Sequence, residues 1–308
     1  MLKETSRKGD EREPTILITC LAPDRADFYP KVLTLFKTIK AFGGKIASSH
    51  LVANFEQHVN PHIDQQLKTL GVETRLVDPF DSSLKYSNKL RMLDTEGDYD
   101  VLMALDCDIA VIRDFSSQIS PNFFQAKPVD QDPLLIEDWK STFSYFGLDL
   151  PSERYRTSFY PKETIPYFNS GVLSIPRMYI RDLRESWARY VKDLWKARTS
   201  LSQKVSEYLS IYLDQMALAL ALASEKIPMR PFPLEMNFPT HHPIDPLLLP
   251  DNMKPFILHY HQKTGRGFSS NLVRKGLLMK TGYKMPDQAV KKVNDLLKHS
   301  QVVLNLCF

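Results

Sequence analysis

Two acidic residues, Asp106 and Asp108, directly follow the most apolar strand-like segment of the chain, residues 99–105 (YDVLMAL). In extended backbone, side chains two positions apart point to the same side, so the two carboxylates face one way and Cys107 faces the other. The two negative charges repel each other, and a cation between them would offset this repulsion. Hard oxygen ligands suit Mg²⁺ or Mn²⁺. A solvated turn after the strand is the alternative, because Asp is common in turns.

Two further polar groups interrupt apolar segments. Asn169 and Ser170 precede Gly171 inside a strand-like run. A Gly there marks close approach of a ligand or another backbone, and the polar pair suits sugar hydroxyls; a bulge with a structural Asn is the alternative. Asp214 and Gln215 interrupt an apolar helix-like run, where burial without partners is costly. This pair either faces a cleft or belongs to a solvent-facing stripe.

Histidines and basic residues complete the set. His259 and His261 are two positions apart on a short strand-like segment and share a face. One imidazole among oxygen ligands suits Mn²⁺, and a structural or surface pair is the alternative. A bound diphosphate needs cationic side chains to balance it. Those available are Lys85, Lys89 and Arg91 before the Asp pair, and Lys263 and Arg266 after the His pair; an ordinary basic surface is the other interpretation.

Short apolar, β-branched runs alternate with segments of helical spacing. This alternation predicts an α/β fold with a mostly parallel sheet flanked by helices. Residues 127–165 and 228–250 are expected to be irregular, the second because it is rich in Pro. Strands are expected over 15–21, 46–52, 73–77, 99–105, 167–175 and 256–260, and helices over 29–42, 63–70, 84–93, 179–195, 205–223 and 286–298.

The chain divides into a tail, one domain and a closing segment. Residues 1–14 are highly charged and predict a disordered lead-in, residues 15–284 form the α/β domain, and residues 285–308 form a C-terminal helix and tail. The helix over 286–298 has one apolar side and lysines elsewhere. It therefore either packs on the domain or touches an anionic membrane.

The composition excludes several classes of protein. A chain of 308 residues, 43% hydrophobic and 25% charged, is typical of globular proteins and not of collagen-like or disordered ones. The net charge of +4 is small, so nucleic acid is not an expected partner. No run of about 18 apolar residues predicts a transmembrane segment, and residues 1–14 lack the apolar core of a signal peptide. An odd cysteine count without metal-ligand spacing predicts reduced thiols in a cytoplasmic protein: Cys20, Cys107 and Cys307.

Four motifs occur in the order YDVLMALDCDIAVIRDF (99–115), YFNSGVLSIPRMY (167–179), YLDQMALALA (212–221) and FILHYH (256–261). In this order they resemble the retaining glycosyltransferases of family 8, across roughly residues 15–265. The resemblance implies the GT-A fold, which is a Rossmann-like nucleotide-diphospho-sugar transferase fold, over residues 15–284. It also implies metal-dependent transfer of a sugar from a nucleotide sugar, usually UDP-linked, to a hydroxyl acceptor that is a carbohydrate, a lipid-linked sugar or a protein.

The same resemblance assigns roles to individual residues. Mn²⁺ or Mg²⁺ would be held by Asp106, Asp108 and His259, which carry the Asp-x-Asp motif and the late His. Because Gln215 is a poor nucleophile, we expect direct attack by the acceptor rather than a covalent intermediate. The residues near the reacting sugar would be Asn169, Asp214 and Gln215, and those around the rest of the donor would be Leu21, Ala22, Asp24, Lys89, Asp106, Cys107 and Ser170, with Lys263 or Arg266 on the diphosphate.

Two alternatives belong to other classes. A phosphatase of the haloacid dehalogenase type also ends an apolar strand with Asp-x-Asp, and there Asp106 would be the nucleophile and Asp108 the acid. Such enzymes carry the motif near the N-terminus and have Thr or Val at the position that Ala110 occupies here. The second alternative is a non-catalytic protein of the same fold that only binds a nucleotide sugar, since fold alone does not imply turnover.

Overall fold

The computed structural model describes residues 12–158, 162–239 and 254–260. The expected C-terminal helix over 286–298, His261 and most of the expected N-terminal tail lie outside these ranges. The helices of the described residues are α1 (Tyr29–Phe42), α2 (Pro61–Thr69), α3 (Ile136–Tyr145), α4 (Arg177–Ala197) and α5 (Gln203–Ser224). The strands are β1 (Ile16–Ala22), β2 (His50–Glu56), β3 (Val72–Val77), β4 (Val101–Leu105), β5 (Ile109–Val111), β6 (Gln125–Pro128), β7 (Tyr155–Arg156), β8 (Glu163–Thr164), β9 (Phe168–Pro176), β10 (Phe238–Pro239) and β11 (Ile257–His259).

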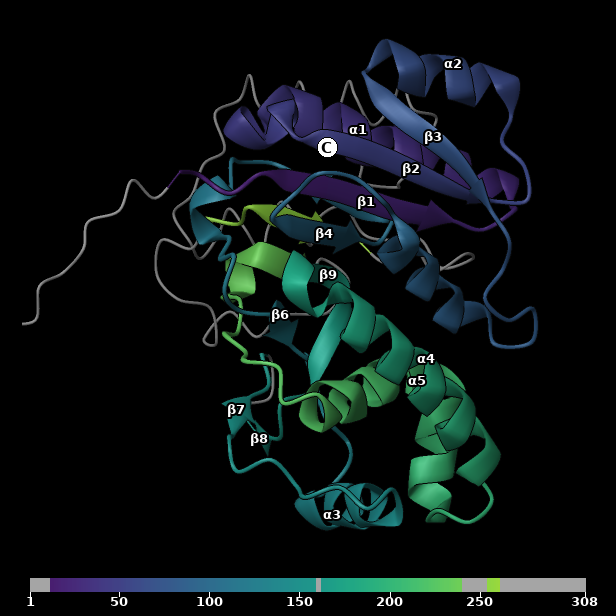
Figure 1. Ribbon diagram of the computed structural model, residues 1–308, viewed down its shortest axis with the longest axis vertical. Helices are drawn as coiled ribbons and strands as arrows, with labels where there is room; N and C mark the ends of the chain where they lie inside the picture. The colour runs from purple at the N-terminus through teal and green to yellow at the C-terminus, as the bar shows by residue number, and fades with distance from the viewer. Residues whose placement is uncertain (1–11, 159–161, 240–253, 261–308) are drawn as a thin grey trace, which may run out of the picture.

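A twisted sheet in the order β3-β2-β1-β4-β9-β6 forms the centre of the described fold (Figure 1). Strands β1 to β4 pair in parallel, whereas β9 pairs antiparallel with both β4 and β6. The predicted α/β fold with a mostly parallel sheet is confirmed. Because β9 runs opposite to β4, the first residues of β9 lie at the edge where β1 and β4 end.

Helices cover both faces of this sheet, and the apolar strands follow from that double burial. On β4, Leu102 and Ala104 pack on the α4 and α5 side, while Met103 and Leu105 pack on the α1 and α2 side. Helices α4 and α5 lie against each other, as Figure 1 shows. The predicted apolar stripe of α4 is buried between α5 and the sheet: Ile180, Leu183, Trp187, Tyr190, Val191 and Leu194.

A second, smaller sheet in the order β10-β11-β5 lies after the end of β4. Strand β11 runs antiparallel to β5, with His259 opposite Ile109, and parallel to β10, with His259 opposite Pro239. This sheet joins two segments that are about 150 positions apart in the sequence. It therefore fixes His259 beside the loop that carries Asp106 and Asp108.

Three predicted segments differ from the structure. The strand expected over 46–52 begins only at His50, because a 3₁₀ helix occupies Gly44–Ser48 with Gly44 at φ +54°. The segment 84–93 forms 3₁₀ turns over Lys85–Asp94 rather than an α-helix.

The segment 127–165 is not irregular throughout, because it contains α3. The Asp138 carboxylate accepts a hydrogen bond from the backbone N–H of Leu135 and so caps the start of this helix. Trp139 anchors α3 with its ring against Tyr167 and its indole N–H on Asp132. Of these two partners, Tyr167 is distant in the sequence, whereas Asp132 is close to the start of the helix.

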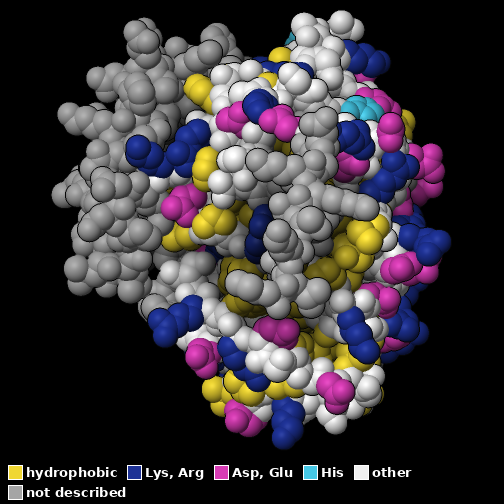
Figure 2. Space-filling view, turned by 60° about the vertical axis from the view of Figure 1, so that its left-hand side comes forward, with side chains coloured by type: hydrophobic (Ala, Val, Ile, Leu, Met, Phe, Trp, Pro, Cys, Tyr) yellow, Lys and Arg dark blue, Asp and Glu magenta, His cyan; other side chains and the backbone are white. Residues whose placement is uncertain are grey.

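The surface in Figure 2 mixes acidic and basic side chains, and hydrophobic side chains gather toward its centre. This mixing agrees with the small net charge. Among the described helices, none is both long enough and apolar enough to cross a membrane.

We expect Trp187→Phe to lower the free energy of unfolding by about 1–3 kcal/mol, because it removes a buried hydrogen bond and part of the indole volume. The indole N–H of Trp187 donates to the backbone carbonyl of Asp214 at 2.8 Å, across the α4–α5 contact. Urea denaturation at equilibrium measures the change. Trp195→Phe, at a partly exposed position of α4, is the control and should cost less; equal costs would contradict this packing.

Candidate active site

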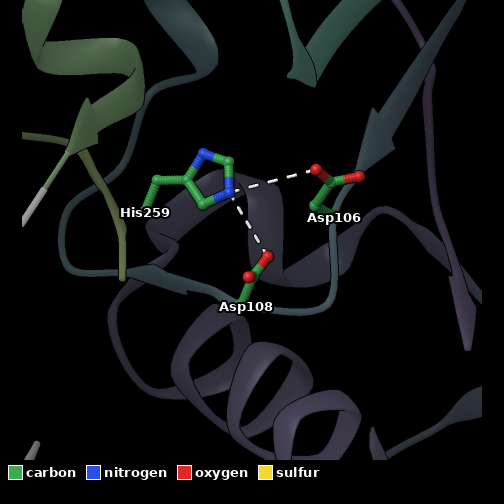
Figure 3. Close-up of side chains that lie close together, drawn as sticks. All are labelled: Asp106, Asp108 and His259. Atoms are coloured by element: carbon green, nitrogen blue, oxygen red, sulfur yellow. Dashed lines mark ion pairs between the residues drawn. The ribbon is translucent and has the colours of Figure 1, made fainter. Parts of the chain in front are cut away.

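Asp106, Asp108 and His259 converge on one point (Figure 3). One carboxylate oxygen from each Asp and an imidazole nitrogen lie within 4.8 Å of one another. The Nε2 atom of His259 is 3.3 Å from Asp108 Oδ1 and 3.9 Å from Asp106 Oδ2. The imidazole is buried, and both carboxylates are partly exposed. The structure thus gathers two hard oxygen donors and one nitrogen donor at a place that solvent can reach.

The backbone explains why these three residues meet. Asp106 directly follows β4, and its N–H donates to the carbonyl of Gly171 on β9 at 2.8 Å. After Asp108 the chain enters β5, which pairs with β11. The N–H of Tyr260 then donates to the carbonyl of Asp108 at 3.0 Å, next to His259. Every member of the cluster is therefore attached to a paired strand.

Burial and neighbouring charges act in opposite directions on the pKa of Asp106. Burial raises the pKa of Asp106, the Lys89 ammonium lowers it, and the neighbouring Asp108 carboxylate raises it again, so that the pKa lies above its ordinary value. A divalent cation would offset the repulsion between the two carboxylates.

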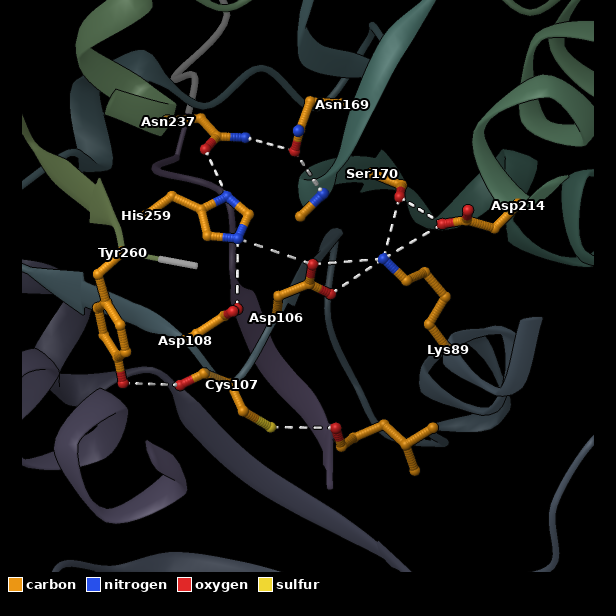
Figure 4. Close-up of polar contacts among 12 residues, drawn as sticks. Lys89, Asp106, Cys107, Asp108, Asn169, Ser170, Asp214, Asn237, His259 and Tyr260 are labelled. Atoms are coloured by element: carbon orange, nitrogen blue, oxygen red, sulfur yellow. Dashed lines mark hydrogen bonds and ion pairs between the residues drawn. The ribbon is translucent and has the colours of Figure 1, made fainter. Parts of the chain in front are cut away.

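Lys89 supplies positive charge on the other side of Asp106. Its Nζ lies 3.1 Å from Asp106 Oδ1 and 3.3 Å from Asp214 Oδ2, and it donates to Ser170 Oγ at 3.0 Å. The Ser170 hydroxyl in turn donates to Asp214 Oδ2 at 2.7 Å. Burial alone would lower the pKa of Lys89, but the two carboxylates raise it above its ordinary value. Figure 4 shows Lys89 as the link between the Asp-x-Asp segment and α5.

Asp214 and Gln215 follow an irregular turn of α5. Tyr212 has non-helical backbone angles of φ −121° and ψ 27° inside this helix. Asp214 is buried, with its carboxylate held by Ser170 and Lys89, and Gln215 is half-buried at the next position. The burial of Asp214 argues against a solvent-facing stripe, and that the pair faces a cleft stays a prediction.

On β9, Gly171 allows His259 to approach the backbone. A Cβ atom at Gly171 would overlap the imidazole ring of His259 and lie 3.0 Å from Asn169 Oδ1. The close approach expected at this Gly is thus made by a side chain from another strand. Asn169 is half-buried beside it, and its Oδ1 accepts the Gly171 N–H at 2.9 Å.

The residues expected to hold the nucleoside lie at the end of β1, next to β4. Leu21 is half-buried and Ala22 is buried, while Asp24 forms a 2.7 Å ion pair with His58. The thiol of Cys107 donates to the Leu21 carbonyl at 3.0 Å, so its side chain faces the β1 backbone, opposite to the two carboxylates. A hydrogen bond with Cys20 and burial raise the pKa of the Cys107 thiol well above its ordinary value.

Two residues predicted for the site are not described by the structure, and one residue of the site was not predicted. Lys263 and Arg266, expected at the diphosphate, lie outside the described residues. Asn237 was overlooked: it is buried and contacts both Asn169 and His259. It lies in a Pro-rich stretch with no periodic pattern, so nothing in the sequence alone distinguishes it from loop residues.

The comparison with known families identifies the chain. Residues 28–226, more than half of it, match the sequence profile of the Rhodobacterales glycosyltransferase domain. The chain belongs to this glycosyltransferase family. The predicted class of enzyme is confirmed, and the phosphatase alternative is excluded. No curated protein sequence matches this glycosyltransferase significantly.

Solved structures show what fold this glycosyltransferase has. Mouse xyloside xylosyltransferase 1 in its apo form is 13% identical, with a TM-score of 0.50 over 82% of this chain and 100% of its own. The bifunctional glycosyltransferase WbbM is 13% identical, with a TM-score of 0.51 over 92% of this chain and 52% of WbbM. The galactosyltransferase LgtC, in complex with donor and acceptor sugar analogs, is 15% identical, with a TM-score of 0.47 over 92% of this chain and 95% of LgtC. The predicted GT-A fold is confirmed.

The residues present fit the metal that the fold implies. Two carboxylates and one imidazole offer donor atoms that lie within 4.8 Å of one another, and Gly171 leaves room for the ring. Carboxylate oxygens suit Mn²⁺ and Mg²⁺, and such ions keep open positions for phosphate oxygens.

We expect Mn²⁺ to raise the melting temperature of the wild type, and we expect Gly171→Ala to abolish that rise. Its methyl group would displace the His259 ring, and the crowding should lower the free energy of unfolding by about 1–3 kcal/mol. Thermal melting with and without Mn²⁺ measures both effects. Gly97→Ala, whose Cβ would meet only side-chain atoms at 3.1 Å or more, is the control. A Gly171→Ala protein that responds to Mn²⁺ like the wild type would refute this ring placement.

We expect Lys89→Met to lower the free energy of unfolding by about 3–5 kcal/mol, because it leaves the carboxylates of Asp106 and Asp214 without their buried cation. The substitution keeps the length of the apolar stem, so the effect reports the charge. Urea denaturation without metal is the measurement, and Lys196→Met on the exposed side of α4 is the control. A cost as small as that of the control would show that Lys89 does not balance these carboxylates.

Proposed function

We propose that this glycosyltransferase transfers a sugar from a UDP-linked donor to a hydroxyl acceptor, with retention and with Mn²⁺ or Mg²⁺ as cofactor. The observation that carries the proposal is the cluster of Asp106, Asp108 and His259, with Lys89 beside it, at the edge where β1 and β4 end. Open α/β sheets bind nucleotides at this edge. The family and the fold support the reaction class, and the cluster supports the metal dependence.

Cleavage of a sugar–phosphate bond develops negative charge on the leaving diphosphate. A divalent ion held by Asp106, Asp108 and His259 would stabilise that charge as a Lewis acid. Lys89 lies between Asp106 and Asp214, and its ammonium group is kept charged by both carboxylates. These groups are already in place before the reaction, so they need not reorganise as the charge develops.

The arrangement around Asp214 supports direct displacement. Its Oδ2 atom accepts a hydrogen bond from Ser170 and pairs with Lys89, and both contacts reduce the nucleophilicity of the carboxylate. Gln215 is a poor nucleophile. We therefore assign Asp214, Gln215 and Asn169 to holding the donor sugar while the acceptor hydroxyl attacks the face that the diphosphate leaves.

We extend the proposal to the acceptor, the cellular location and the nucleoside. The acceptor is a carbohydrate, a lipid-linked sugar or a protein hydroxyl, and the enzyme works in the cytoplasm. Leu21, Ala22 and Asp24 at the end of β1 hold the base and ribose, because β1 is the neighbour of β4 and ends at the same edge.

We expect Asp106→Asn to reduce metal-dependent cleavage of a UDP-sugar at least about a hundredfold, because loss of a metal ligand costs several kcal/mol of transition-state stabilisation. Release of UDP from a panel of UDP-sugars with Mn²⁺ measures this activity, and EDTA should abolish it. Asp98→Asn, at a fully exposed position, is the control and should retain full activity. Wild-type protein that binds UDP-sugars without any turnover would instead identify a nucleotide-sugar-binding protein.

We expect the product to keep the anomeric configuration of the donor, which ¹H NMR of the freshly formed product reads directly. We also expect mass spectrometry of the enzyme with donor alone to detect no glycosylated protein. An inverted product would contradict retention, and a trapped adduct on Asp214 would contradict direct displacement.

A further inference from the structure

A chain of hydrogen bonds runs from the β9 backbone to the metal-facing histidine (Figure 4). The backbone N–H of Gly171 donates to Asn169 Oδ1 at 2.9 Å, and Asn237 Nδ2 donates to the same oxygen at 2.9 Å. Asn237 Oδ1 lies 2.9 Å from His259 Nδ1. Four residues from three strand regions are thus connected in series.

The first member of this chain determines the orientation of the others. A backbone N–H can only donate, so the Asn169 atom that faces the Gly171 N–H must be the carbonyl oxygen. That oxygen also faces Asn237, so Asn237 must present its NH₂ group there. The other end of the Asn237 amide is then its oxygen, which can only accept. The partner of that oxygen, Nδ1 of His259, must therefore carry a proton.

The proton on Nδ1 determines what the other ring nitrogen of His259, Nε2, can do at the metal site. In a neutral imidazole that is protonated on Nδ1, the lone pair is on Nε2. Nε2 is the atom that faces Asp106 and Asp108, at 3.9 and 3.3 Å. A metal ligand must present a lone pair, so this tautomer is the one competent to bind an ion between the carboxylates.

Burial prevents the chain from rearranging easily. Asn237 and His259 are each 1% exposed, so water cannot replace a lost partner. A flipped Asn237 amide would place its oxygen against Asn169 Oδ1 and its NH₂ group against His259. Strand pairing also fixes the spacing, because Phe238, which follows Asn237, lies opposite Leu258, which precedes His259.

We propose that Asn237 is a positioning residue that holds His259 in the Nδ1–H tautomer, with Nε2 directed at the metal site. By engaging Asn169 Oδ1 as well, it leaves the NH₂ group of Asn169 as the part that can contact the donor sugar. The proton on Nδ1 follows from the hydrogen bonds alone, whereas the use of Nε2 in metal binding rests on the proposed function. Two measurements test the protonation of His259 and its role in metal binding separately.

The first measurement is made on the wild-type protein without metal, and a variant serves only to assign the signals. A ¹⁵N-detected correlation spectrum of the histidine rings, recorded without metal at about pH 8.5, where an ordinary imidazole is neutral, reports which nitrogen carries the proton. The His259 signals are assigned by their loss in His259→Gln. We expect protonation on Nδ1. Protonation on Nε2 in the wild type would overturn the proposal, whatever the activity of the enzyme.

The second measurement tests whether Asn237 is responsible. Asn237→Leu can neither accept from Nδ1 nor donate to Asn169, whereas Asn237→Asp can still accept from Nδ1. We expect Asn237→Leu to lose the defined tautomer and to bind Mn²⁺ about 10- to 100-fold more weakly by calorimetry. We expect Asn237→Asp to keep the proton on Nδ1 and to bind Mn²⁺ more tightly than Asn237→Leu, but below the wild type, because its carboxylate cannot donate to Asn169 Oδ1.

Two controls separate positioning from general damage. Asn122→Leu, at an exposed position, should leave both the spectrum and the Mn²⁺ affinity unchanged. Circular dichroism identifies a variant that has not folded, and in that case the wild-type spectrum still decides the question. A folded Asn237→Leu protein with wild-type tautomer and Mn²⁺ affinity would show that Asn237 does not position His259. Correct tautomer without Mn²⁺ binding in the wild type would instead contradict the metal dependence in the proposed function.

Discussion

Three carboxylates held close together need positive charge from two directions, and the organisation of this protein follows from that need. Asp106 lies between Asp108 and the ammonium of Lys89, and Lys89 also pairs with Asp214. Lys89 therefore compensates the side of Asp106 that faces α5. The other side, shared with Asp108 and His259, has the donor set for a divalent ion. In the proposed function, this ion and Lys89 together balance the charge that a diphosphate brings to this edge.

The pairing of the strands places these charged residues close together. The central sheet places the ends of β1 and β4 and the start of β9 at one edge, and the small β10-β11-β5 sheet adds His259 from a distant part of the chain. Gly171 serves both sheets: its N–H orders the Asn169 amide, and its missing side chain leaves space for the imidazole. The backbone of Gly171 thus affects both the hydrogen bonds of Asn169 and the packing of the His259 ring.

Much of this arrangement could be predicted from the sequence, because its signals are local. The apolar run before Asp106 predicted β4, and helical spacing predicted α1 and α4. The grouping of Asp106, Asp108 and His259 was expected from motif order. Helix α3 was missed although its capping residue, Asp138, is a local signal. Asn237 could not be predicted, because its contacts are with residues that are distant in the sequence. The roles of Lys89 and Ser170 as partners of Asp214 likewise depend on tertiary packing.

The most direct test of the account is a crystal structure with Mn²⁺ and UDP, in which anomalous scattering locates the metal. The account predicts one strong peak within bonding distance of Asp106, Asp108 and His259 Nε2, with diphosphate oxygens completing the coordination and Lys89 still between Asp106 and Asp214. An empty cluster with UDP bound elsewhere, or a metal that is held without His259, would contradict it.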